Sequence, residues 1–161
     1  MSDSENKTNN ALPLRRISRE WSLQYLYQRD LSGEDSQSSL EWFWSQHETN
    51  NDSDYELGEK EIQKCKRQAT STIEGVLDNL EAIDAKIESY AKNWSLERMA
   101  AIDRNILRVA TYELLYRDEI PGAVSINEAL EIVKVFSSEQ KSSAFINGIL
   151  DKIKKETENA S

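Results

Sequence analysis

The chain has 161 residues, of which 38% are hydrophobic and 30% are charged, and it carries a formal net charge of −9. A chain of this length and composition can bury the core of one domain, which excludes disorder throughout. Two prolines and five glycines are too few for the frequent turns of a sandwich or barrel, and a single cysteine excludes an internal disulfide. We therefore expect an all-helical protein.

The N-terminal residues 1–13 are polar and are predicted to be a disordered tail, followed by a single helical domain over 14–157. The tail contains neither the basic start nor the apolar stretch of a signal peptide. No run of sequence approaches the roughly 18 apolar residues that a membrane span requires. We therefore expect a cytoplasmic protein with no membrane association.

The predicted helices of the N-terminal half follow from the spacing of apolar residues. This spacing predicts a first helix over 15–31 and a short aromatic helix over 40–48. A polar loop is expected at 50–54. Helical spacing then continues over 57–92, which exceeds the usual length of a helix, so we expect a kink or break between Gly75 and Ala82.

The C-terminal half has the most regular pattern. A broad apolar stripe predicts a central helix over 96–117. Ser125 and Glu128 have the spacing of a capping box and are expected to begin the next helix. A last helix presents apolar residues of 145–153 on one face. The sequence thus predicts six or seven helices and no strand.

The sequence gives little evidence for a catalytic site. His47 is the only histidine and Cys65 the only cysteine, so neither a zinc site nor a nucleophile–histidine pair can be assembled. The five glycines are too scattered for a phosphate-binding loop. We therefore expect no enzyme activity, no cofactor and no metal.

A cluster of arginines at the start of the first helix contrasts with the acidic chain. Arg15, Arg16 and Arg19 fall within about 100° of one another around a helix. Residues 15–30 hold four arginines against two acids, a net charge of +2, which leaves −11 for the rest of the chain. Cations at a helix N-terminus oppose the helix dipole, so stability does not call for them. We expect all three arginines to project from the helix end, either as a solvated basic end or as a site for nucleic acid.

Four segments resemble one known family. They are R-R-I-S-R-E-W-S-L-Q-Y-L-Y-Q at 15–28, I-D-R-N-I-L-R-V-A-T-Y-E-L at 102–114, I-P-G-A-V-S-I-N-E-A-L-E-I-V-K-V-F at 120–136 and F-I-N-G-I-L-D-K-I at 145–153. In this order and spacing they resemble the signatures of the NusB family of bacterial transcription antitermination factors. The resemblance implies two three-helix bundles packed across each other, with the basic first helix spanning them.

The resemblance also implies a function. It suggests binding to boxA RNA of ribosomal RNA leaders together with NusE, a small-subunit ribosomal protein, within the RNA polymerase antitermination complex. RNA contacts are implied for six residues: Arg15, Arg16, Arg19, Lys141, Ser142 and Phe145. Contacts with NusE are implied for Tyr27, Glu97 and Asp103.

Several alternatives remain open at the level of sequence. Tyr27 and Phe145 both fit core positions of their helices as well as the implied interfaces. The segment 137–141 is one residue longer than is usual in the family, which leaves its register open. A homodimer is possible, and a helical protein-interaction module without RNA binding is the alternative function.

Overall fold

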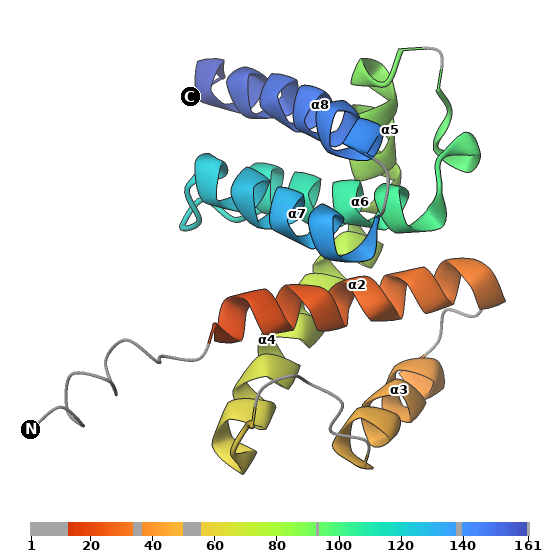
Figure 1. The fold of residues 1–161 in the computed structure, drawn as a ribbon, viewed down its shortest axis with the longest axis vertical. Helices are drawn as coiled ribbons and strands as arrows, with labels where there is room; N and C mark the ends of the chain where they lie inside the picture. Colours follow the sequence, from red (N-terminus) through yellow and green to blue (C-terminus); the bar gives the residue numbers. More distant parts are fainter. Residues whose placement is uncertain (1–12, 34–36, 50–55, 93, 138–139, 161) are drawn as a thin grey trace, which may run out of the picture.

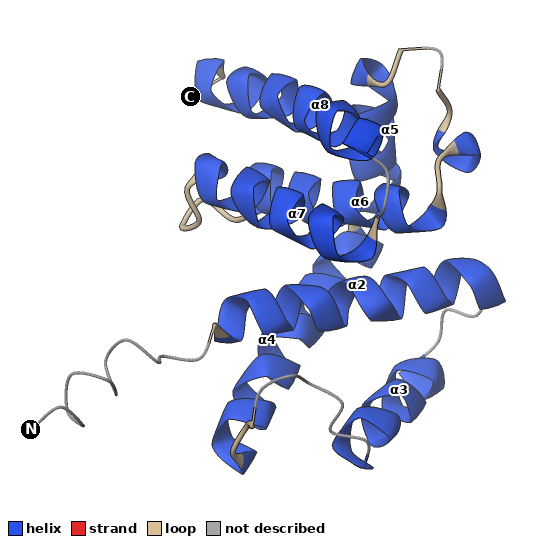
Figure 2. Ribbon diagram, viewed as in Figure 1, coloured by secondary structure: helices blue, strands red, loops and turns tan. Residues whose placement is uncertain are grey.

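The computed structural model describes residues 13–33, 37–49, 56–92, 94–137 and 140–160 (Figure 1). Seven α-helices and one 3-10 helix occupy these ranges, and Figure 2 shows no strand among them. In chain order the elements are α2 (Leu14–Ser32), α3 (Gln37–Thr49), α4 (Glu59–Asp78), α5 (Leu80–Tyr90), η1 (Leu96–Arg98), α6 (Ala101–Tyr116), α7 (Gly122–Phe136) and α8 (Gln140–Asn159). The predicted tail residues 1–12, the loop at 50–54 and positions 138–139 of the segment 137–141 lie outside the described residues.

Helix α2 joins the two halves of the molecule. It packs against α4 on one side and against α6 on the other, and it ends at Gly33, whose φ of 73° is the left-handed conformation that glycine adopts readily. Helix α3 packs against α2 through aromatic side chains. The ring centroids of Trp44 and Trp21 lie 5.9 Å apart, and those of Phe43 and Tyr25 lie 5.4 Å apart. The predicted first two helices are therefore confirmed.

The predicted break in the long helical segment is also confirmed. Helix α4 ends at Asp78 and α5 begins at Leu80, with Asn79 between them at φ −119° and ψ 21°. The Asn79 side chain donates a hydrogen bond of 2.8 Å to the carbonyl of Gly75, which satisfies a backbone group near the break.

The C-terminal half is built around α6. Helices α5, α7 and α8 all contact it, and residues 105–114 are buried without interruption. The single helix predicted over 96–117 is instead divided into η1 and α6, because Met99 and Ala100 adopt extended conformations between them. Figure 1 shows α7 lying between α2 and α8.

The predicted capping box is wrong. Helix α7 begins at Gly122, directly after Pro121, whose restricted φ and missing N–H suit a helix start. Ser125 and Glu128 lie inside the helix and bond to other helices: the Ser125 hydroxyl donates to Glu113 at 3.0 Å, and the Glu128 carboxylate accepts from Arg16. Residues that resembled a local cap thus connect distant parts of the chain.

Candidate nucleic-acid interface

The start of α2 presents two of the three predicted arginines. Arg15 is exposed and forms no ion pair or hydrogen bond with the described residues. Arg16 is half-exposed and makes a bidentate ion pair with Glu128 of α7, at 2.8 and 3.1 Å. The hydrogen bond and charge of Arg16, with the charge of Arg19, hold the pKa of Glu128 below its ordinary value although burial would raise it. Arg16 therefore links α2 to α7 while its side chain stays within reach of solvent.

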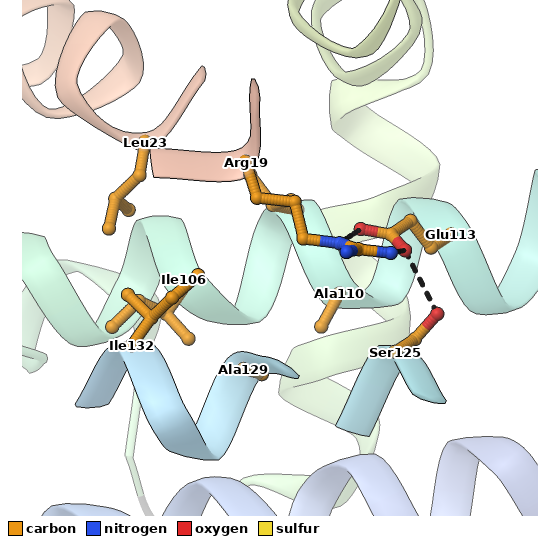
Figure 3. Close-up of a pocket in the computed structure, with 9 residues that line it drawn as sticks. Arg19, Leu23, Ile106, Ala110, Glu113, Ser125, Ala129 and Ile132 are labelled. Atoms are coloured by element: carbon orange, nitrogen blue, oxygen red, sulfur yellow. Dashed lines mark hydrogen bonds and ion pairs between the residues drawn. The ribbon is translucent and has the colours of Figure 1, made fainter. Parts of the chain in front are cut away.

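Arg19 lies inside the molecule, so the prediction that all three arginines project from the helix end is wrong. Its residue is only 8% exposed, and its guanidinium donates to both carboxylate oxygens of Glu113, at 2.8 and 2.7 Å. Figure 3 shows the Glu113 carboxylate held between Arg19 of α2 and the hydroxyl of Ser125 of α7. Burial alone would lower the pKa of Arg19, but the hydrogen bond and charge of Glu113 raise it overall. Arg19 thus joins α2, α6 and α7.

The cavity beside this ion pair is too small for a ligand. It is lined by Arg19 and Glu113 together with apolar residues such as Leu23, Ile106 and Ile132, and its volume is about 10 Å³ (Figure 3). That is the space of about one water molecule. A ligand larger than a water molecule could therefore bind only on the outer surface at this place.

A second cleft, of about 80 Å³, opens beside the same Arg19–Glu113 pair, where α2, α4 and the α6–α7 connection meet. Its lining includes Arg15, Gln68, Thr72 and Arg117, together with the carboxylates of Glu113 and Glu119. Arg117 donates to Glu119 at 2.6 Å and to the Ser71 hydroxyl at 3.4 Å. Sequence reasoning did not identify this cleft, because its residues come from three separate helical segments.

The start of α8 holds the remaining predicted RNA contacts, but they differ in accessibility. Lys141 is exposed, and Phe145 is half-buried against the core. Ser142 is only 7% exposed, and its hydroxyl donates to Asp103 at 3.0 Å. Ser142 is therefore largely covered, because the first turn of α8 packs this residue against the first turn of α6, and its implied contact with RNA stays a prediction.

The residues implied for NusE lie near the end of α2 that is opposite to Arg15 and Arg16. Tyr27 is 38% exposed, which rules out the core position for it. Glu97 in η1 is exposed, and Asp103 in the first turn of α6 is half-buried with its bond to Ser142. In Figure 1 the end of α2 and the η1–α6 segment lie on the same side of the molecule.

A buried ionic network, which sequence reasoning missed, ties this side together. Asp30 at the end of α2 accepts hydrogen bonds from Arg104 at 2.8 Å, from Asn105 at 2.9 Å and from Arg108 at 3.0 Å. Arg108 also donates to Asp84 of α5 at 2.8 Å. Burial alone would raise the pKa of Asp30, but its bonds with Arg104 and Asn105 and the charges of Arg108 and Arg104 lower it overall. The network fixes α2, α5 and α6 relative to one another.

The described part of the chain gives no evidence for metal binding or for thiol chemistry. No group of three His, Cys, Asp or Glu side chains there could hold a metal ion. Cys65 is buried, and this burial raises the pKa of its thiol, which makes the reactive thiolate rarer. None of the described helices combines the length and apolar content that crossing a membrane would require.

Comparison with known proteins identifies the family. The sequence model of the NusB family matches residues 16–155. The transcription antitermination protein NusB of Thermodesulfovibrio yellowstonii is 44% identical over 150 residues, which cover 88% of this chain and 92% of that protein. The NusB of Myxococcus xanthus is 42% identical over 139 residues, which cover 86% of this chain and 93% of that protein.

Solved structures agree with this match. The T. maritima NusB superposes with a TM-score of 0.73 at 39% identity, covering 90% of this chain and 92% of that one. A chain from the crystal structure of antitermination factors NusB and NusE in complex with dsRNA has a TM-score of 0.72 at 24% identity, covering 91% and 99%. Fold and relatives define a transcription factor of the antitermination class rather than an enzyme. The chain belongs to the NusB family.

Proposed function

We propose that this chain is an RNA-binding antitermination factor that binds boxA RNA of ribosomal RNA leaders jointly with NusE. In this role it promotes processive transcription of ribosomal RNA operons as part of the RNA polymerase antitermination complex. The observation that carries the proposal is the pair of arginines, Arg15 and Arg16, at the accessible start of α2 in a chain of net charge −9. The crystal structure of a protein of related fold in complex with NusE and dsRNA supports this proposal.

The proposed RNA surface has two parts that flank α7. Arg15 and Arg16 supply charge on one side, and guanidinium groups suit both phosphates and unpaired bases. Lys141 and Phe145 lie at the start of α8, at the other end of α7 (Figure 1). Phe145 is half-buried, so we propose that the exposed part of its ring stacks on a base while the rest packs on the core.

Arg19 and Ser142 have a different proposed role. Each is buried in a bond to a carboxylate, Arg19 with Glu113 and Ser142 with Asp103. We propose that they position the RNA surface: Arg19 holds the helix that carries Arg15 and Arg16, and Ser142 holds the turn that carries Lys141. They support RNA binding without touching RNA.

NusE is proposed to dock on the side that carries Tyr27, Glu97 and Asp103. The network around Asp30 gives this side a fixed shape, since Arg104 also donates to the carbonyl of Leu96 beside Glu97. Acidic residues and an exposed tyrosine suit a basic ribosomal protein. Such a partner would also offset the negative charge that repels RNA from this chain.

The test of this function is a titration of boxA RNA with the purified chain, with NusE and with their equimolar mixture. The chain alone is expected to bind weakly because of its net charge of −9, and the mixture at least about tenfold more tightly than either protein, as two joined surfaces give. A scrambled RNA of the same length is the control. Equal affinity of the mixture and the separate proteins would contradict joint binding. Complex formation with NusE without any RNA affinity would instead support the alternative of a protein-interaction module.

A further inference from the structure

Helix α4 carries a stripe of positive charge that the proposed RNA surface does not include. Lys60, Lys64 and Arg67 follow one another at four and three residues, which places them within about 60° around the helix. We call these three residues the α4 stripe. Lys60, Lys64 and Arg67 are all exposed, and none of them forms an ion pair with the described residues.

The α4 stripe brings three basic side chains without an ion-pair partner among the described residues onto one helix face. On the other helices four lysines form ion pairs with carboxylates, as Lys86 does with Glu156 and Lys134 with Glu131, whereas Lys141 and Lys152 form none with the described residues. The acids nearest to the stripe in sequence, Glu59 and Glu61, lie about 100° away from Lys60 around the helix, and Glu61 lies about 60° from Lys64 without forming an ion pair with it. They occupy the first turn of α4, where negative charge favours the helix dipole, and Glu61 accepts a hydrogen bond from the backbone of Gly58.

The α4 stripe leads into the cleft beside Arg15. Ser71 continues the stripe four residues after Arg67, and Arg117 donates to its hydroxyl. The next residues around the helix, Gln68 and Thr72, line the cleft, and Gln68 accepts a hydrogen bond of 2.9 Å from Ser18 of α2. From Lys60 to Ser71 this surface extends about 16 Å along the helix. It therefore extends toward the arginine end of α2 across a cleft whose lining also includes Glu119, the ion-pair partner of Arg117.

We propose that the α4 stripe binds the phosphate backbone of RNA that continues past boxA, so that the footprint runs from Arg15 across the cleft onto α4. This inference rests on the proposed function and adds a second RNA segment to it. Unpaired, exposed lysine and arginine side chains contact phosphates without reading sequence, and they gain affinity by releasing counterions. The extension of the stripe toward Arg15 favours RNA over an acidic protein as the occupant, and the proposed protein partner is itself basic.

The test compares the wild type with the triple variant Lys60→Gln, Lys64→Gln, Arg67→Gln, each mixed with NusE. Glutamine keeps nearly the same helix propensity, and all three sites are exposed, so the fold is expected to persist. Affinity is measured for boxA RNA alone and for boxA RNA extended by leader sequence at either end, over a series of salt concentrations. A matched variant, Lys92→Gln, Lys152→Gln, Lys155→Gln, removes the same charge from exposed positions on the C-terminal half; of these three lysines, Lys155 forms an ion pair, with Asp151.

The stripe variant is expected to bind one of the extended RNAs about tenfold more weakly than the wild type does. The slope of the logarithm of its binding constant against the logarithm of salt concentration should fall in magnitude by about 2, near 0.7 for each lost phosphate contact. Its affinity for boxA RNA alone and that of the matched variant should change much less. Unchanged binding of the extended RNAs, an equal loss in the matched variant, or a loss of NusE binding without RNA would each overturn the inference. If the mixture of the wild type with NusE binds no RNA, the proposed function is contradicted as well. If the wild type binds RNA and the stripe variant binds it equally well, only the proposed role of the α4 stripe is contradicted.

Discussion

Replacing Arg19 with alanine is expected to lower the free energy of unfolding by about 3 to 5 kcal/mol, because the change leaves the buried carboxylate of Glu113 without its cation. Both side chains are under 10% exposed, at 9% for Arg19 and 5% for Glu113. The Ser125 hydroxyl would remain as a neutral donor to Glu113, which does not replace a charge. Urea denaturation followed by circular dichroism measures the difference.

Two neighbouring arginines serve as controls for this result. Arg15→Ala should change the free energy of unfolding by less than about 0.5 kcal/mol, as is usual at exposed sites. Arg16→Ala removes a half-exposed ion pair and should cost about 0 to 1 kcal/mol. If Arg19→Ala is as harmless as Arg15→Ala, the buried position of Arg19 is wrong and a direct contact with RNA becomes possible for it again.

The second large effect is expected at Asp30. Its side chain is 10% exposed, and Asp30→Ala removes the shared acceptor of Arg104 and Arg108, with an expected loss of about 3 to 5 kcal/mol in the free energy of unfolding. Arg108 would keep its ion pair with Asp84, so the loss should fall near the lower limit. Asp118→Ala, at an exposed position of the α6–α7 connection, is the control and should change stability by less than about 0.5 kcal/mol.

The contribution of Asp30 should also depend on pH. Its pKa in the folded protein lies below the ordinary value of 3.8, so the unfolded chain takes up a proton there first as the pH falls. The stabilisation by Asp30 is therefore complete well above pH 4 and is lost as the pH falls through the folded-state pKa. The difference in stability between the wild type and Asp30→Ala should shrink in that acid range. A difference that stays constant from neutral pH to well below pH 4 would contradict the network.

The fold was accessible from the sequence because apolar residues repeat at helical spacing. That spacing predicted α2 nearly to its ends, and the excessive length of 57–92 predicted the break that Asn79 makes. The capping box failed for a physical reason: a Ser and a Glu three residues apart serve equally well as partners for other helices. Only the fold shows that Ser125 faces Glu113 and that Glu128 faces Arg16.

The site was predictable only in part. The sequence showed that basic residues gather at 15–19, but it did not show which of them face inward. Glu113 offered a signal, since a lone carboxylate within the apolar stretch of 106–114 requires a buried partner. Arg19 lies one turn into α2, at nearly the same angle as the apolar Leu26, and so faces α6. The partners of Asp30 lie more than 70 residues away in the chain, which leaves no local pattern to find.

The most direct test uses the double variant Arg15→Ala, Arg16→Ala. This variant is mixed with NusE, and the affinity of the mixture for boxA RNA is measured. The control is Lys152→Ala, Lys155→Ala, which removes the same charge from exposed sites on α8. We expect the arginine variant to bind boxA RNA at least about tenfold more weakly than the control, with a flatter salt dependence. Its free energy of unfolding should stay within about 1 kcal/mol of the wild type. Equal RNA affinity of the two variants would contradict the proposal that the accessible end of α2 binds RNA.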